Sequence, residues 1–148
     1  MNLPSPDKMA QLVSGVTQTM LGLTFAPDGA SRGHQALAWR TAVLPIAGAR
    51  PLTVGLSSDE IGCEKLASAM FACPPTEVDG AMMNDSLCEL VNMTAGLLKS
   101  AMSLNQALGL PRIIPGADAP AVPAASPHVV VLKAESCGLV LWIYEGVA

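Results

Sequence analysis

The sequence predicts an α/β fold of the α+β kind, in which helices cover a single mixed, largely antiparallel sheet. Three segments have apolar residues at helical spacing, and five shorter segments are apolar or alternate as strands do. Their order is helix, two strands, two helices and three strands, with no internal repeat. A chain of 148 residues is long enough for one domain with a core and too short for two of usual size, so we expect one domain over residues 1–148.

The first helix is expected over residues 6–23, where apolar residues recur at intervals of three and four. These residues are Met9, Leu12, Val13, Val16, Met20 and Leu23. Ser5 suits the N-cap position, and Pro6 suits the first turn, where a backbone N–H has no partner to lose. The run of Ala, Pro, Asp and Gly at 26–29 predicts a turn after this helix.

A β-hairpin and a second helix are expected next. Residues 34–46 and 51–56 predict two strands joined by a short turn that contains a glycine. Ser57 and Glu60 have the spacing of a capping box, which predicts that Ser57 caps the second helix. The two prolines at 74–75 end this helix.

The longest helix is expected after these prolines. Thr76 and Asp79 provide a second capping signal, and helical spacing then continues to about Leu104. Gly80 leaves the first residue of this helix open by several positions, because glycine is a poor helix former.

Three strands complete the predicted sheet. A short strand covers residues 110–114, and two more cover residues 128–134 and 139–144, with a turn at 135–138. The last two strands are apolar on both faces, so we expect them to be buried on both sides or to pair with another subunit. Residues 116–127 are rich in alanine and proline and lack periodicity, which predicts a surface loop.

Composition argues against several classes of partner. The net charge is −4, and only eight lysines and arginines are spread along the chain, which disfavours nucleic acid. The apolar runs are shorter than the roughly 20 residues needed to cross a bilayer. The N-terminus also lacks the continuous apolar stretch of a signal peptide, so we expect a cytoplasmic protein without membrane contact. Because 51% of the residues are hydrophobic and only 14% are charged, we expect a homodimer that covers apolar surface.

The cysteines and histidines do not have metal-ligand spacing. No CxxC pair is present, and neither histidine lies close in sequence to a cysteine, so we expect no metal site. Free cysteines are among the most buried residue types, which predicts inert thiols in the core. A Cys–His nucleophile assembled in three dimensions is the alternative. The residues are Cys63, Cys73, Cys88, Cys137, His34 and His128.

The longest predicted helix carries a polar stripe opposite its packing face. With about 100° per residue, the packing face comprises Leu87, Leu90, Val91, Thr94, Leu98 and Ala101. The opposite side, here called the polar stripe, comprises Asp85, Glu89, Asn92, Gly96 and Lys99. Asparagine prefers caps and turns to helix interiors. An outward Asn92 beside an outward Glu89 therefore indicates a functional site.

The spacing Asp85-x-x-x-Glu89-x-x-Asn92 resembles the signature of the CheC, CheX and FliY family of bacterial chemotaxis phosphatases. Residues 89–102 and 108–116 are similar to the CheX branch, in which this helix leads into a short Leu-x-x-Pro strand. CheC and FliY proteins typically carry two copies of the signature, whereas the first predicted helix here has no Glu-x-x-Asn. The resemblance is therefore to the CheX branch, and it implies a dimer with one site in each subunit.

The resemblance implies a protein aspartyl-phosphate phosphatase. Its substrate would be the phosphorylated aspartate of a CheY-like response-regulator receiver domain, which is hydrolysed to aspartate and inorganic phosphate. By resemblance, Asn92 orients the attacking water and Glu89 pairs with the active-site lysine of the receiver. The receiver supplies Mg²⁺, so we expect no cofactor held by this chain. Gly96 leaves space for the partner's backbone, and Asp85 either contacts the partner or is a solvated acidic residue.

Two other functions stay open at this point. One is a non-catalytic CheX-like dimer that binds a receiver or scaffolds a two-component signalling complex, because Leu97 stands where the family often has a polar residue. The other is an unrelated α/β enzyme or ligand-binding domain, which the free thiols and the general fold would allow. The sequence does not identify the cognate receiver or the pathway.

Overall fold

The computed structural model describes residues 4–27, 39–49, 51–104, 106–115, 128–134 and 137–145. The helices are α1 (Pro6–Leu21), α2 (Glu60–Phe71), the short 3₁₀ helix η1 (Pro75–Glu77) and α3 (Gly80–Ala101). The strands are β1 (Ala26–Pro27), β2 (Arg40–Ile46), β3 (Leu52–Ser58), β4 (Arg112–Pro115), β5 (His128–Ala134) and β6 (Cys137–Glu145). The predicted order of elements is confirmed, and β1 and η1 are added to it.

The strands form one six-stranded sheet with the order β1-β5-β6-β3-β2-β4. Every pairing among the described strands is antiparallel. The predicted hairpin is β2–β3, in which Leu44 lies opposite Val54. A second hairpin pairs β5 with β6, and Val130 lies opposite Leu141. The prediction of a largely antiparallel sheet is therefore confirmed.

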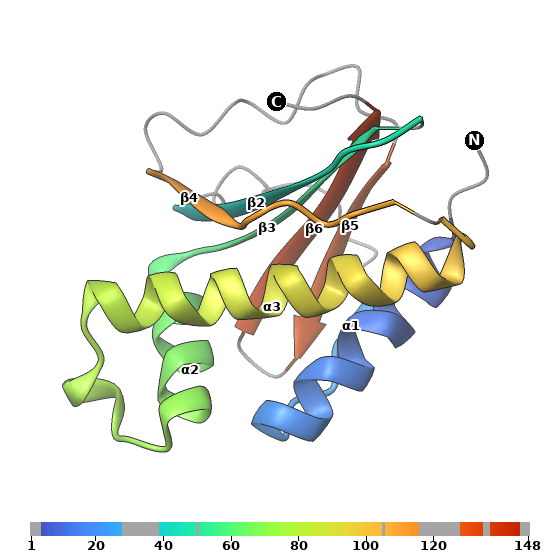
Figure 1. The fold of residues 1–148 in the computed structure, drawn as a ribbon. Helices are drawn as coiled ribbons and strands as arrows, with labels where there is room; N and C mark the ends of the chain where they lie inside the picture. Colours follow the sequence, from blue (N-terminus) through green and yellow to red (C-terminus); the bar gives the residue numbers. More distant parts are fainter. Residues whose placement is uncertain are drawn as a thin grey trace.

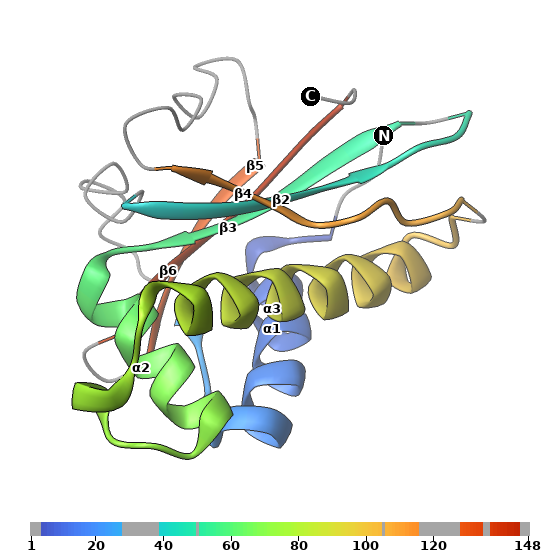
Figure 2. The same cartoon turned by 60° about the vertical axis from the view of Figure 1, so that its left-hand side comes forward.

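All three α-helices lie on one side of the sheet, and α3 runs across it (Figures 1 and 2). The strand residues that face the helices are apolar and fully buried, as a pleated strand with one face on the core requires. In β2 and β3 they are Ala42, Leu44, Ile46, Leu52, Val54 and Leu56. This core holds α3 against the sheet and leaves the outer side of that helix for other contacts.

A smaller buried cluster lies on the opposite face of the sheet. It comprises Val43, Ile114, Val131, Val140 and Trp142. The Trp142 indole packs directly on Gly55, where a Cβ atom would overlap the ring. The last two strands are thus buried on both faces along their described side chains, except for the exposed Lys133, as the sequence predicted.

The helix caps are partly as predicted. Ser5 caps α1, and its Oγ accepts a hydrogen bond from the Lys8 N–H at 3.2 Å. The capping box at Ser57 is wrong, because β3 continues to Ser58 and Ser57 pairs with Val140 of β6. Asp59 caps α2 instead, with its Oδ1 accepting from the Gly62 N–H at 2.7 Å.

Several predicted boundaries also differ. The helix expected to reach about Leu104 ends at Ala101, and Thr76 belongs to η1 while Asp79 alone caps α3. Strand β6 begins at Cys137, inside the predicted turn. The predicted loop at 116–127 and the first part of the predicted strand at 34–46 lie outside the described residues, from which β2 starts at Arg40. Within the described part of the chain, no helix is long and apolar enough to cross a bilayer.

Candidate functional site on α3

Helix α3 presents its predicted packing face to the sheet. Leu87, Leu90, Val91, Thr94 and Leu98 are all buried, with exposed fractions of 2% or less. The prediction fails only at Ala101, which is exposed, because the helix ends at that residue. At its start, Asp79 Oδ1 accepts a hydrogen bond from the Met82 N–H at 2.9 Å. The helix is thus fixed along its inner side and capped at its N-terminus.

The polar stripe lies on the outer side of α3. Asp85, Glu89 and Asn92 are exposed, and Gly96 and Lys99 are half-buried. Residues three and four apart on a helix are neighbours, about 5–6 Å apart at Cβ, so Glu89 and Asn92 form an adjacent pair. Neither side chain has a hydrogen bond or an ion pair to any other described residue. Both side chains are therefore free to contact another molecule.

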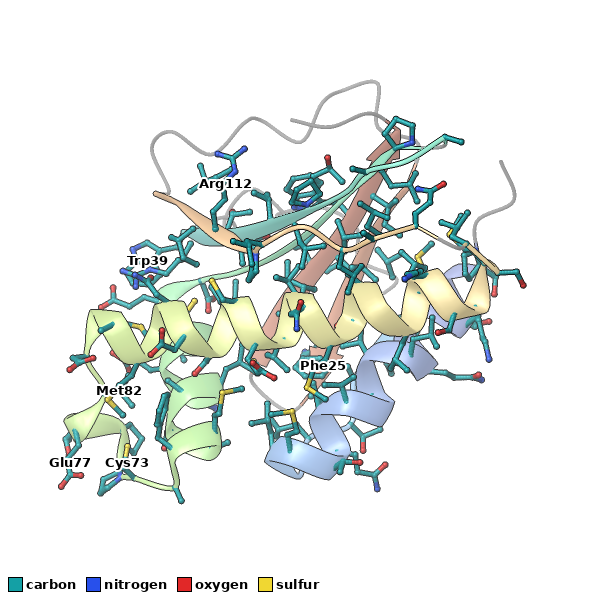
Figure 3. All side chains as sticks on the ribbon, viewed as in Figure 1. Phe25, Trp39, Cys73, Glu77, Met82 and Arg112 are labelled. Atoms are coloured by element: carbon teal, nitrogen blue, oxygen red, sulfur yellow. The ribbon has the colours of Figure 1, made fainter. Side chains whose placement is uncertain are left out.

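Arg40, the first residue of β2, holds the N-terminal end of α3. Its Nη1 donates to the Gly80 carbonyl oxygen at 2.9 Å and to Asn84 Oδ1 at 2.6 Å. Its guanidinium lies over the Trp39 ring, 4.6 Å from the centroid, and Figure 3 shows Trp39 near the first turns of α3. Arg40 therefore fixes the helix to the sheet immediately before Asp85.

A pocket of about 480 Å³ lies between α1 and α3, beside the polar stripe. The residues from α1 are Gly15, Val16 and Thr19, and those from α3 are Met93, Gly96, Leu97 and Ser100. We call it the α1–α3 pocket. Gly96 belongs both to this pocket and to the polar stripe, so the two features are continuous.

Sequence reasoning did not find Arg40 or the α1–α3 pocket. The hydrogen bonds of Arg40 join residues 40 and 44 positions apart. The pocket joins two helices that are separated by the first hairpin and α2. Local spacing carries no signal for either contact, although the two mid-helix glycines of the pocket, Gly15 and Gly96, were visible as poor helix formers.

The two core thiols have no catalytic character. Burial raises the pKa of Cys63 to about 12 and that of Cys137 to about 11, so both are protonated at neutral pH. The prediction of inert core thiols is confirmed for these two residues. Cys73 and Cys88 are only half-buried, and Cys88 packs against the edge of the core. Burial, and then the nearby Asp85 carboxylate, raises the pKa of Cys88.

The chemistry available at the polar stripe is that of a carboxylate and a carboxamide. No group of three or more His, Cys, Asp or Glu residues that could hold a metal ion occurs within the described residues. His34 lies outside them, and only the backbone of His128 is described, so neither is placed against a cysteine. Glu89 can accept hydrogen bonds from a cation, and Asn92 can both donate to and accept from a water molecule.

A family model described as chemotaxis phosphatase CheX matches residues 40–134, a range that includes α3 and the whole polar stripe. Among curated proteins, no sequence matches the chain.

Solved structures share the fold at low sequence identity. The chemotaxis protein CheX from Desulfovibrio desulfuricans is 18% identical, with a TM-score of 0.72 over 94% of this chain and 99% of that chain. CheX from Vibrio vulnificus is 14% identical, with a TM-score of 0.75 over 96% and 97%. A chain of the CheX–CheY–BeF₃–Mg²⁺ complex from Borrelia burgdorferi is 15% identical, with a TM-score of 0.68 over 97% and 100%. The family model confirms the resemblance seen in the sequence, and these structures show the same fold.

Proposed function

Because the chain belongs to the chemotaxis phosphatase family of the CheX type, we propose that it hydrolyses the aspartyl phosphate of a CheY-like receiver domain. The observation that carries the proposal is the exposed, unpartnered pair Glu89 and Asn92 on a helix that is capped and packed along its inner side. An outward pair on a fixed helix suits a site that must enter a second protein, because the backbone is already ordered and only the two side chains lose freedom on binding.

Asn92 is the proposed water-positioning residue. Its carboxamide oxygen accepts a hydrogen bond from the attacking water, and its N–H₂ group donates one to the water or to a phosphoryl oxygen. The water oxygen forms a bond to phosphorus, the bond from phosphorus to the aspartyl oxygen breaks, and the water protons remain with the phosphate and solvent. Phosphoryl transfer depends chiefly on such positioning, so no strong base is required.

The neutral amide at position 92 also avoids charge repulsion. A carboxylate there would bring a negative charge toward a phosphoryl group that is already anionic. The Mg²⁺ that balances this charge is held by the receiver, so the proposal needs no cofactor on this chain. Asn92 therefore positions the attacking water without adding negative charge to the site.

Glu89 is the proposed docking residue. Its carboxylate pairs with the active-site lysine of the receiver through a charge-assisted hydrogen bond, which fixes the register of the two proteins. Asp85 lies one turn earlier on the same stripe and adds negative charge facing that lysine, while Gly96 leaves room for the receiver's backbone. The stripe thus offers an acidic end and a small, neutral end to one partner.

The similar structure from Borrelia burgdorferi is a complex of CheX with CheY, BeF₃ and Mg²⁺, which supports a CheY-like partner for this chain. We further propose that residues 1–148 form one domain and that two chains form a homodimer with two separate polar stripes, in agreement with the low charged fraction of 14%.

The test is the dephosphorylation rate of a phosphorylated receiver in the presence of Mg²⁺. The wild-type chain should accelerate loss of phosphate, and Asn92→Ala should reduce the accelerated rate by about 100-fold. Gln18→Ala is the matched control, because Gln18 is an exposed carboxamide on α1 that is outside the polar stripe. Equal rates for the wild type and Asn92→Ala would contradict the proposal.

The exposed Leu97, at 39% of its maximal accessible area, favours one second candidate. An apolar side chain next to the polar stripe also suits a module that binds a receiver without turnover. This function predicts that the wild-type chain binds the phosphorylated receiver but leaves its intrinsic rate of phosphate loss unchanged.

A further inference from the structure

The α1–α3 pocket is lined almost entirely by apolar atoms and glycine. Val16, Met93 and Leu97 supply the apolar walls, and no charged side chain contributes. The polar side chains in it are the Thr19 and Ser100 hydroxyls. A volume of about 480 Å³ is large enough for a ligand or for side chains of a partner. Because charged groups are absent, the pocket suits an uncharged, apolar occupant.

Two glycines line this pocket at positions where close packing does not require glycine. A Cβ atom at Gly15 would meet nothing within 4 Å, and one at Gly96 would meet only Leu108 Cδ1 at 3.9 Å, an ordinary contact. Neither residue has a positive φ. Glycine inside a helix is destabilising relative to alanine. Both glycines therefore lower the stability of their helices relative to alanine, and both line the α1–α3 pocket.

Other glycines of the chain show the contrast. At Gly55 a Cβ would overlap Trp142, and at Gly109 it would lie 2.6 Å from Pro45 Cγ. Close packing explains both of these, but it does not explain Gly15 and Gly96. What these two glycines share is the α1–α3 pocket.

The pocket is placed so that a partner docked on Asn92 would cover it. Gly96 lies one turn after Asn92 on the same stripe, and Met93 is the next residue along the helix. Leu97 lines the pocket and is 39% exposed, so its side chain is accessible to a docked partner. A second copy of the chain seated over the pocket would cover Asn92 as well, which would block the proposed site.

We propose that the α1–α3 pocket receives an apolar side chain of the receiver domain, from a loop next to the phosphorylated aspartate. This inference rests on the proposed function and adds a specificity element to it. Glu89 and Asn92 read groups that receivers share, whereas a shaped apolar pocket distinguishes receivers by the size of one side chain. Leu97 is then part of the docking surface. The leucine at this position, where the family often has a polar residue, is therefore compatible with an active site.

The test fills the pocket from α1, remote from the polar stripe. Gly15→Leu places a side chain in the open space at Gly15, and Gln18→Leu adds the same side chain one turn later, outside the pocket. The steady-state rate of dephosphorylation is measured against increasing concentrations of phosphorylated receiver. We expect Gly15→Leu to raise KM by about tenfold with kcat nearly unchanged, because burial of one apolar side chain is lost. Gln18→Leu should leave both constants at the wild-type values.

A second variant distinguishes weaker docking from misfolding. Gly15→Ala should raise Tm, because alanine is the better helix former, and should raise KM less than Gly15→Leu does. A stabilised variant with weaker docking cannot be explained by loss of structure. Unchanged KM in both Gly15 variants, with an active wild type, would overturn the pocket proposal alone.

Two further outcomes count against the proposal. If Gly15→Leu changes the oligomeric mass in solution while KM stays at the wild-type value, the occupant is a second copy and the proposal is wrong. If the wild-type chain neither binds nor dephosphorylates any phosphorylated receiver, the proposed function fails and this inference fails with it. Asn92→Ala distinguishes the proposed hydrolysis from docking at the pocket. It should lower kcat and leave KM nearly unchanged.

Discussion

Helices α1 and α3 lie on the same side of the sheet and contain similar runs, Gln-Leu-Val-Ser at 11–14 and Glu-Leu-Val-Asn at 89–92. Ser14 is half-buried, and its Oγ donates to the Phe25 carbonyl oxygen at 2.5 Å and accepts from the Phe25 N–H at 2.8 Å. Asn92, at the corresponding place in the run, is exposed, and its side chain has no hydrogen bond to any described residue.

Ser14 is therefore a structural polar residue, whereas the side chain of Asn92 is available to a partner. In α1 the polar side chain satisfies both backbone groups of Phe25 and so ties the segment after the helix to it. In α3 the side chains of Glu89 and Asn92 have no hydrogen-bond partner among the described residues. Similar local sequences therefore serve stability in one helix and, as we propose, receiver docking and hydrolysis in the other.

The largest effect should come from charge at position 92. Asn92→Asp keeps the shape of the side chain but adds a negative charge facing the phosphoryl group, so we expect kcat to fall by about 100-fold. Tm should change little, because Asn92 is exposed. Steady-state kinetics measure kcat, and thermal unfolding measures Tm. A variant that keeps the wild-type kcat would show that Asn92 does not face the reacting group.

Glu89→Gln tests docking and makes α3 resemble α1, which has Gln11 at the corresponding place. Loss of a charge-assisted hydrogen bond should raise KM for the phosphorylated receiver by about tenfold. The dependence of KM on salt concentration should also become weaker, because a charged contact is lost. If KM and its dependence on salt concentration were unchanged, Glu89 would not be part of the docking surface.

Ser14→Ala tests the opposite role in α1. Removal of the hydroxyl leaves the Phe25 N–H and carbonyl oxygen without their partner, so the free energy of unfolding should fall by about 1–2 kcal/mol. Chemical denaturation measures this change, and kcat should stay at the wild-type value. If Ser14→Ala were as stable as the wild type, the claim that Ser14 has a structural role in α1 would be wrong.

Thr94→Val should produce the smallest effect and a stabilising one. Thr94 Oγ1 lies on the inner side of α3 and is the buried side-chain polar atom that has no hydrogen-bond partner among the described residues. Valine has nearly the same shape and no hydroxyl, so the free energy of unfolding should rise by about 1 kcal/mol. Denaturation of the wild type and the variant under the same conditions checks the sign.

Helical and strand periodicity predicted the elements and the exposed side of α3. The strand at 128–134 has its predicted bounds, and the polar stripe lies opposite the packing face as the 100° spacing requires. The capping box at Ser57 failed because pairing with Val140, far along the chain, keeps that residue in a strand. The Arg40 contacts and the α1–α3 pocket depend on tertiary packing, so local patterns could not reveal them.

The most direct test of the account is the single-turnover rate of receiver dephosphorylation at saturating protein, measured for Asn92→Ala beside Ser14→Ala. We expect Asn92→Ala to lose about 100-fold in rate, while Ser14→Ala keeps the wild-type rate at a temperature where it is folded. Wild-type rates for both variants, or equal losses in both, would contradict the claim that α3 alone carries the hydrolytic site.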